Sequence, residues 1–130
     1  MNEHERIAAI INAKNSAPLS LDPKHTALIV VDMQRYFTQA GFPFTQVWEK
    51  FSPGCTEGYL RRTRETVVPS IQKLLGAMRA HGSRVFFTAV GTEGGDGHDL
   101  PCWLRAFEEV ALATIGARVW PSPDDPSWQI

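Results

Sequence analysis

The sequence predicts an α/β fold of three layers, in which helices cover both faces of a mainly parallel sheet. Two continuous apolar and β-branched runs, Thr26–Asp32 and Arg84–Val90, have the composition of parallel strands buried on both faces. Between them, residues 61–80 carry apolar side chains at helical spacing. Strand, helix and strand in this order indicate a right-handed parallel crossover.

The elements before the second strand follow from local patterns. Residues 3–13 place three isoleucines on one side of a short amphipathic helix, and residues 15–24, with two prolines, form a loop. Residues 35–60 are rich in aromatic side chains and glycine, which is typical of a long binding loop or lid. Pro69 indicates that the regular helix after this loop starts near Thr66, and His81-Gly82 ends it.

The remaining elements are a glycine-rich loop over residues 91–100 and a helix over residues 101–114. We expect this helix to direct inward Trp103, Leu104, Phe107 and Val110. The proline-rich tail is expected to end in the first residues of a third strand. Because a typical sheet has about 5–6 strands, we interpret residues 1–130 as a single domain that is the N-terminal portion of a larger α/β domain.

Composition excludes several classes of protein. Thirteen basic and fourteen acidic residues give a formal charge of -1, which offers no electrostatic case for a nucleic-acid partner. The polar, acidic N-terminus does not resemble a secretory signal, and no apolar run approaches the roughly 20 residues of a membrane span. Cys55 and Cys102 form neither a disulfide framework nor a zinc motif. These observations favour a cytoplasmic protein without a membrane partner.

Asp32 is the first candidate functional residue. It ends the first predicted strand, and open parallel sheets place their ligand crevices at the carboxyl ends of their strands. A carboxylate in that position can transfer protons to or from a substrate. It can equally cap the turn that follows, and its position alone leaves both interpretations open.

The residues around Asp32 carry a resemblance to a known family. The run Leu28-Ile-Val-Val-Asp-Met-Gln34, followed by Phe37, resembles the opening motif of the isochorismatase-like cysteine hydrolases. The similarity continues through Ala80-His-Gly82 and Val85-Phe-Phe-Thr88, and ends at the acidic turn Pro121-Ser-Pro-Asp-Asp125. It covers most of the chain in the family's order. A departure is Arg35-Tyr36, where the family usually has Asn-Asp.

The resemblance implies a catalytic aspartate, lysine and cysteine. Asp32 matches the aspartate, which deprotonates the cysteine thiol and later protonates the leaving group. We expect the lysine and the cysteine downstream of residue 130, so that the 130-residue chain alone is inactive. The longer protein would hydrolyse a small amide, ureide or related C–N bond through a thioester, as a homo-oligomer and without a cofactor. Hydrolysis of the vinyl ether of isochorismate is a variant within the same class.

The resemblance also bears on metal binding. The family's nicotinamidase branch binds a metal with residues just after the second strand, where this chain has Thr88-Ala-Val-Gly-Thr92 without those ligands. His98 beside Asp99 in a glycine-rich loop is weak support for a metal site. We therefore expect no metal.

Aromatic residues near Asp32 are candidates for a substrate pocket. Phe37, Phe42, Phe44 and Trp48 would wall a site suited to a small planar amide or ring. Gln34 is expected in the same pocket, where it would help to orient Asp32. Each aromatic ring has the alternative of packing its segment onto the sheet. Cys102 is expected to be a small apolar side chain buried under Trp103.

Two other function classes stay open. A catalytically silent homologue would serve as a binding or assembly module, with another subunit covering its exposed sheet edge. A flavodoxin-like domain with an aspartate at the end of a strand is the third possibility, although the chain lacks the paired acidic residues of such receivers.

Overall fold

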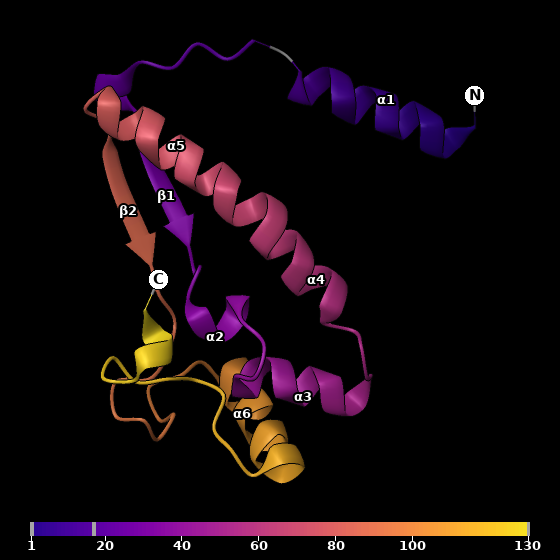
Figure 1. The fold of residues 1–130 in the computed structure, drawn as a ribbon, viewed down its shortest axis with the longest axis vertical. Coiled ribbons are helices and arrows are strands. Elements are labelled where there is room, and N and C mark those ends of the chain that lie inside the picture. The colour runs from indigo at the N-terminus through magenta and orange to yellow at the C-terminus, as the bar shows by residue number, and fades with distance from the viewer. Residues whose placement is uncertain (1, 17, 130) are drawn as a thin grey trace.

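The computed structural model describes residues 2–16 and 18–129 and shows a mixed α/β fold built on a two-stranded parallel sheet (Figure 1). Strand β1 (Ala27–Val31) pairs with β2 (Arg84–Thr88), so that Val31 lies opposite Thr88. The predicted α/β class and parallel pairing are confirmed. The described residues contain no third strand.

The crossover between the strands is one long helical segment. Helix α4 (Glu57–Arg62) continues through a π-helical turn, η2 (Thr63–Val67), into α5 (Val68–Ala80). The N–H of Val68 bonds to the Thr63 carbonyl, five residues back, and Pro69 lies in the first turn of α5. Proline has no N–H to donate to a helix hydrogen bond. The π-helical turn lies just before Pro69, and regular α-helix begins again at Val68. The stop at His81-Gly82 agrees with these bounds. The helical segment begins at Glu57, well before the start expected near Thr66, and only its regular part α5 begins close to that residue.

Among the described residues, the sheet is covered on one face only. Helix α5 runs along the sheet (Figure 1), on the face where Val30 is buried. On the opposite face Ile29, Val31 and Phe86 are 56%, 61% and 50% exposed. The expectation of strands buried on both faces is therefore wrong for the described residues, because no described helix covers the second face.

Helix α1 (Glu3–Asn15) confirms the predicted N-terminal helix. Asn2 and Glu5 form a reciprocal capping box at its start. The helix extends away from the sheet (Figure 1), and its isoleucines Ile7, Ile10 and Ile11 are exposed. After the intervening loop, a short 3-10 turn, η1 (Pro23–His25), leads into β1.

The long loop predicted for residues 35–60 is wrong. This segment forms α2 (Arg35–Thr38), α3 (Pro43–Phe51) and the first turn of α4. Pro43 occupies the first turn of α3, where a missing N–H costs nothing. Val47 is fully buried on the side of α3 that faces α6 (Cys102–Ile115).

Helix α6 exposes two of the four residues that we expected inside. Leu104 is buried and Phe107 is partly buried, whereas Trp103 and Val110 are 68% and 42% exposed. The inward position is taken by Glu108, whose carboxylate accepts a hydrogen bond from the Val119 N–H at 2.7 Å. The pattern of apolar residues could not predict a buried glutamate on the inner side of α6.

The core lies beyond the carboxyl ends of the strands, between α2, α3 and α6. Its buried members are Tyr36, Val47, Leu100, Leu104, Ala111, Val119 and Trp120. The chain then ends in a 3-10 turn, η3 (Pro126–Trp128), capped by the Asp125 carboxylate. The expectation of a third strand here is wrong over residues 126–129, since Pro126 and this cap set a turn; residue 130 lies outside the described residues.

Candidate active site at the strand ends

Asp32 follows β1 directly and has a left-handed backbone, with φ of 51°. Aspartate is one of the few residues other than glycine that adopt this conformation readily. Its N–H donates to the Thr88 carbonyl at 3.2 Å, and its Oδ1 accepts a hydrogen bond from the Thr88 hydroxyl at 2.7 Å. The carboxylate is thereby fixed against the end of β2.

Asp32 lines a cavity of about 610 Å³, within the range of about 300–1,000 Å³ that is usual for small-molecule sites. The walls are mostly aromatic and apolar. The other lining residues are Phe37, Phe44, Ala89, Val90, Gly91, Asp99, Leu100, Pro101, Trp103, Leu104, Trp120 and Trp128. The cavity therefore combines a carboxylate at a strand end with walls suited to a flat ligand.

The structure brings some predicted pocket residues together and separates others. Phe37 and Phe44 line the cavity with Asp32, and their rings meet edge to face at 4.8 Å. Phe42 packs against the core and does not line the cavity. Trp48 lines a neighbouring hollow and stacks on Phe107 at 5.6 Å.

Gln34 does not have the predicted role of orienting Asp32 in the pocket. It is fully buried, and its side-chain oxygen accepts a hydrogen bond from the Val90 N–H at 2.8 Å. It thus connects the segment after β1 to the segment after β2 and does not line the cavity. The Nε2 of Gln34 has no hydrogen-bond partner among the described residues.

Tyr36 adds a second connection between the same two segments. Its hydroxyl donates to the Val90 carbonyl at 2.8 Å. Burial raises the pKa of Tyr36 far above its ordinary value, and the negative charge of Asp32 raises the pKa further. Tyr36 is therefore a neutral hydrogen-bond donor at physiological pH.

Sequence reasoning did not identify the second half of the cavity. Asp99, Trp103, Trp120 and Trp128 all come from residues after β2. A Cβ on Gly91 would lie 2.3 Å from both the Pro121 carbonyl oxygen and the Trp128 ring. Only glycine at this position lets the C-terminal segment close the wall, and the tryptophans of the tail were the available signal.

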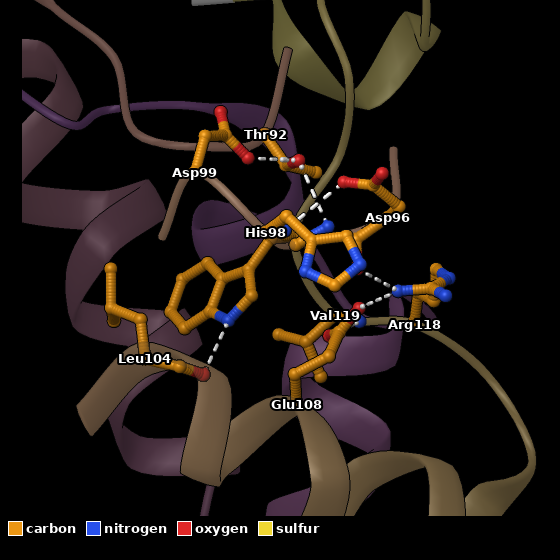
Figure 2. Close-up of polar contacts among 10 residues, drawn as sticks. Thr92, Asp96, His98, Asp99, Leu104, Glu108, Arg118 and Val119 are labelled. Atoms are coloured by element: carbon orange, nitrogen blue, oxygen red, sulfur yellow. Dashed lines mark hydrogen bonds and ion pairs between the residues drawn. The ribbon is translucent and has the colours of Figure 1, made fainter. Parts of the chain in front are cut away.

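Asp99 is held by the loop that carries it, as Figure 2 shows. The Thr92 hydroxyl donates to its Oδ1 at 2.6 Å, and the Glu93 N–H donates to its Oδ2 at 2.8 Å. The bond from Thr92, followed by that from Glu93, lowers the pKa of Asp99 below its ordinary value. Thr92 is fully buried, and its hydroxyl oxygen also accepts a hydrogen bond from the Gly97 N–H. The hydroxyl that binds Asp99 is therefore itself held in place.

A neighbouring polar network, also drawn in Figure 2, is structural. Arg118 donates to the Asp96 carbonyl at 3.0 Å and to the buried Glu108 carboxylate at 3.2 Å. The Trp120 indole N–H donates to the Leu104 carbonyl at 3.0 Å. These bonds attach the segment after α6 to α6 and to the glycine-rich loop, and so position Trp120 in the cavity wall.

Neither cysteine lines the cavity that contains Asp32. Both Cys55 and Cys102 are exposed. The expectation that Cys102 is buried under Trp103 is wrong, because both side chains are exposed. Across residues 2–16 and 18–129, no three His, Cys, Asp or Glu side chains form a group able to bind a metal ion.

Comparison of the chain with protein-family models, with curated proteins and with solved structures gives no match. In the part of the chain that the structure describes, every helix is too short or too polar to cross a lipid bilayer.

Proposed function

We propose that this chain forms part of a cysteine hydrolase of the isochorismatase type, which acts on a small amide, ureide or related C–N bond. The observation that carries the proposal is the position of Asp32. Its carboxylate lies at the carboxyl end of β1, bonded to Thr88, in a cavity with aromatic walls. This is the position in which an open parallel sheet presents its reactive groups.

The proposed chemistry uses Asp32 as an acid/base. Its carboxylate takes the proton of a cysteine thiol, and the thiolate attacks the substrate carbonyl. As the C–N bond breaks, Asp32 returns the proton to the leaving nitrogen. Water then hydrolyses the thioester to a carboxylic acid and restores the thiol. We propose that the cysteine, and the lysine that accompanies it in the family, follow residue 130 in the sequence of the complete protein.

We propose a three-layer α/β/α domain in the complete protein, in which further strands and helices cover the open face of the sheet. The protein would be a cytoplasmic homo-oligomer that uses neither a metal nor a cofactor. Its partner would be a small-molecule substrate, since the nearly balanced charge offers nothing to a nucleic acid.

The test is an Asp32→Asn variant of the gene product that carries this chain together with the residues after it. Turnover of the best substrate from a panel of small amides and ureides should fall by about 10²–10⁴-fold, the usual contribution of a general acid/base. Asp124→Asn, the same change in an exposed turn outside the cavity, is the control and should leave turnover unaltered. An unchanged rate in the Asp32 variant would remove this residue from catalysis.

The isolated chain provides a second test. Purified 1–130 should release no amine or ammonia from any member of the panel, because neither of its cysteines lines the cavity. Measured turnover that survives replacement of both Cys55 and Cys102 would contradict a thioester mechanism.

One observation favours a second function, that of a catalytically silent binding or assembly module. The open sheet face carries Ile29, Val31 and Phe86, each at least half exposed. Apolar groups in such a patch gain free energy when a partner covers them. If the gene product has no turnover and sedimentation velocity shows association that Phe86→Ser abolishes, assembly becomes the better assignment.

A further inference from the structure

The charge of the cavity wall distinguishes among possible substrates. Two carboxylates, Asp32 and Asp99, line the cavity, and no lysine, arginine or histidine is among the described residues that line it. The wall therefore has a negative potential, which attracts a cation and repels an anion.

The hydrogen bonds that Asp99 accepts favour its charged form. Its two oxygens accept bonds from the Thr92 hydroxyl and from the Glu93 N–H. A carboxylate has about four acceptor sites, so these two bonds leave capacity for a ligand. The Asp99 side chain is exposed at the cavity, which gives a ligand access to that capacity.

The aromatic walls favour the same kind of ligand. Phe37, Phe44 and Trp103 line the cavity together with Trp128, and Trp103 is 68% exposed. The faces of aromatic rings attract ammonium, amidinium and guanidinium groups, and indole does so most strongly. A carboxylate beside such rings combines a charge-assisted hydrogen bond with a cation–π contact.

We propose that the cavity selects a small molecule with a positively charged nitrogen group, and that Asp99 is its specificity-determining residue. This inference deepens the proposed function, on which its substrate part rests: the scissile amide would be presented to Asp32 while Asp99 and the indoles bind the cationic group. The class of substrate is thus a cationic amide, such as an amide that also carries a protonated amine or an amidine. A carboxylate-bearing substrate is disfavoured by the two like charges.

The test uses three probes of one shape and different charge: benzamidinium, benzamide and benzoate. Each is titrated into the 1–130 chain while tryptophan fluorescence is recorded. Benzamidinium should bind about tenfold more tightly than benzamide, and benzoate should bind the least. Raising the salt concentration should weaken the binding of benzamidinium and leave that of benzamide unaltered, because salt screens the charges.

Two variants assign the effect to particular residues. Asp99→Asn should remove most of the tenfold preference for benzamidinium while benzamide affinity stays within about twofold. Asp124→Asn is the matched control for the loss of one negative charge and should keep the preference. Trp103→Leu, on an exposed side chain whose replacement spares the core, should reduce the preference by a smaller factor.

The outcomes separate this inference from the proposed function. Equal affinity for all three probes, tightest binding of benzoate, or an unchanged preference in Asp99→Asn would each overturn the inference. If Asp99 only held its loop in place, its replacement would weaken the binding of benzamide as well as that of benzamidinium. A loss of the preference for benzamidinium with unchanged benzamide affinity therefore requires direct contact with the cation. If Asp32→Asn keeps full turnover while the charge preference holds, the hydrolase mechanism is wrong and the cation site stands.

Discussion

The two ends of this molecule differ in how well they bury similar side chains. Beyond the carboxyl ends of the strands, Tyr36, Val47 and Trp120 are at most 6% exposed. In the sheet itself, Ile29 and Phe86 lie opposite one another in register and are 56% and 50% exposed. We call these regions the strand-end core and the open sheet face.

The difference shows that an apolar run in the sequence specifies a strand but does not specify which segments pack against its two faces. The strand-end core is closed by segments from both halves of the chain, including α2, α3, α6 and the tail. The open sheet face has no such cover among the described residues. Stability should therefore reside in the strand-end core, and the same apolar area should contribute much less in the sheet.

Trp120→Ala should have the largest effect on stability. The substitution removes ring contacts with Tyr36, Phe37 and Phe107, together with the hydrogen bond to the Leu104 carbonyl. Loss of a buried tryptophan costs about 3–5 kcal/mol, which should leave the 1–130 chain unfolded or nearly so. Urea denaturation followed by circular dichroism measures the change, and a cost below about 1 kcal/mol would place the stability elsewhere.

Gly91→Ala should have the next largest effect. The new methyl group would overlap the Pro121 carbonyl and the Trp128 ring, so the tail must move away from the loop after β2. Overpacking of this kind costs about 1–3 kcal/mol. Urea denaturation and fluorescence quenching by acrylamide check the result, with Gly58→Ala, which meets open space in α4, as the control. Wild-type stability and quenching would contradict the close packing of the tail.

Phe86→Ala should cost less than either change, although it removes a whole aromatic ring. The side chain is half exposed on the open sheet face, so about half of the usual gain of roughly 1.5–3 kcal/mol for burial is at stake. If the loss measured in urea equals that of Trp120→Ala, the open sheet face is covered in solution. Repeating the measurement at two protein concentrations shows whether a second copy provides the cover.

The smallest effect concerns the turn between α3 and α4, at the rim of the strand-end core. Glu49 accepts hydrogen bonds from the Thr56 hydroxyl, the Gly54 N–H and the Thr56 N–H. These bonds lower the pKa of Glu49 from its ordinary value of 4.5, with the Thr56 hydroxyl as the largest cause. The stabilisation is present above pH 4.5 and is lost as the pH falls through the lowered pKa.

Glu49→Gln should therefore lower the urea midpoint slightly at pH 7, and the difference from wild type should shrink below the ordinary pKa. Glu57→Gln, at the start of the next helix, is the control. A difference that is constant from pH 7 to pH 3 would show that the carboxylate charge does not support the turn.

Sequence reasoning predicted the strands, the crossover helix and the place of Asp32, because an unbroken apolar run and a long helical stripe are local signals. It missed α3, since aromatic residues near glycine were interpreted as a loop. The overlooked signal was Pro43 followed by Phe44, Val47 and Trp48 at helical spacing. Proline at the first turn and this spacing together indicate a helix.

The rest of the site depends on contacts between distant segments. Asp99 lines the cavity because Thr92 and Glu93 fix its loop, and Trp128 does so because Gly91 leaves room for it. Glu108 is buried because Arg118 and Val119 supply its partners, ten and eleven residues later in the chain. No periodic pattern in one segment contains such information.

The left-handed backbone of Asp32 has an evolutionary consequence. Asparagine tolerates this conformation as aspartate does, whereas a β-branched or bulky residue there would strain the turn. One exchange of carboxylate for amide would therefore remove the acid/base of the proposed mechanism while leaving the connection to Thr88 and the architecture of both strands. A lineage that duplicates this gene would have a short mutational path from the proposed hydrolase to a receptor that binds the same ligands without consuming them.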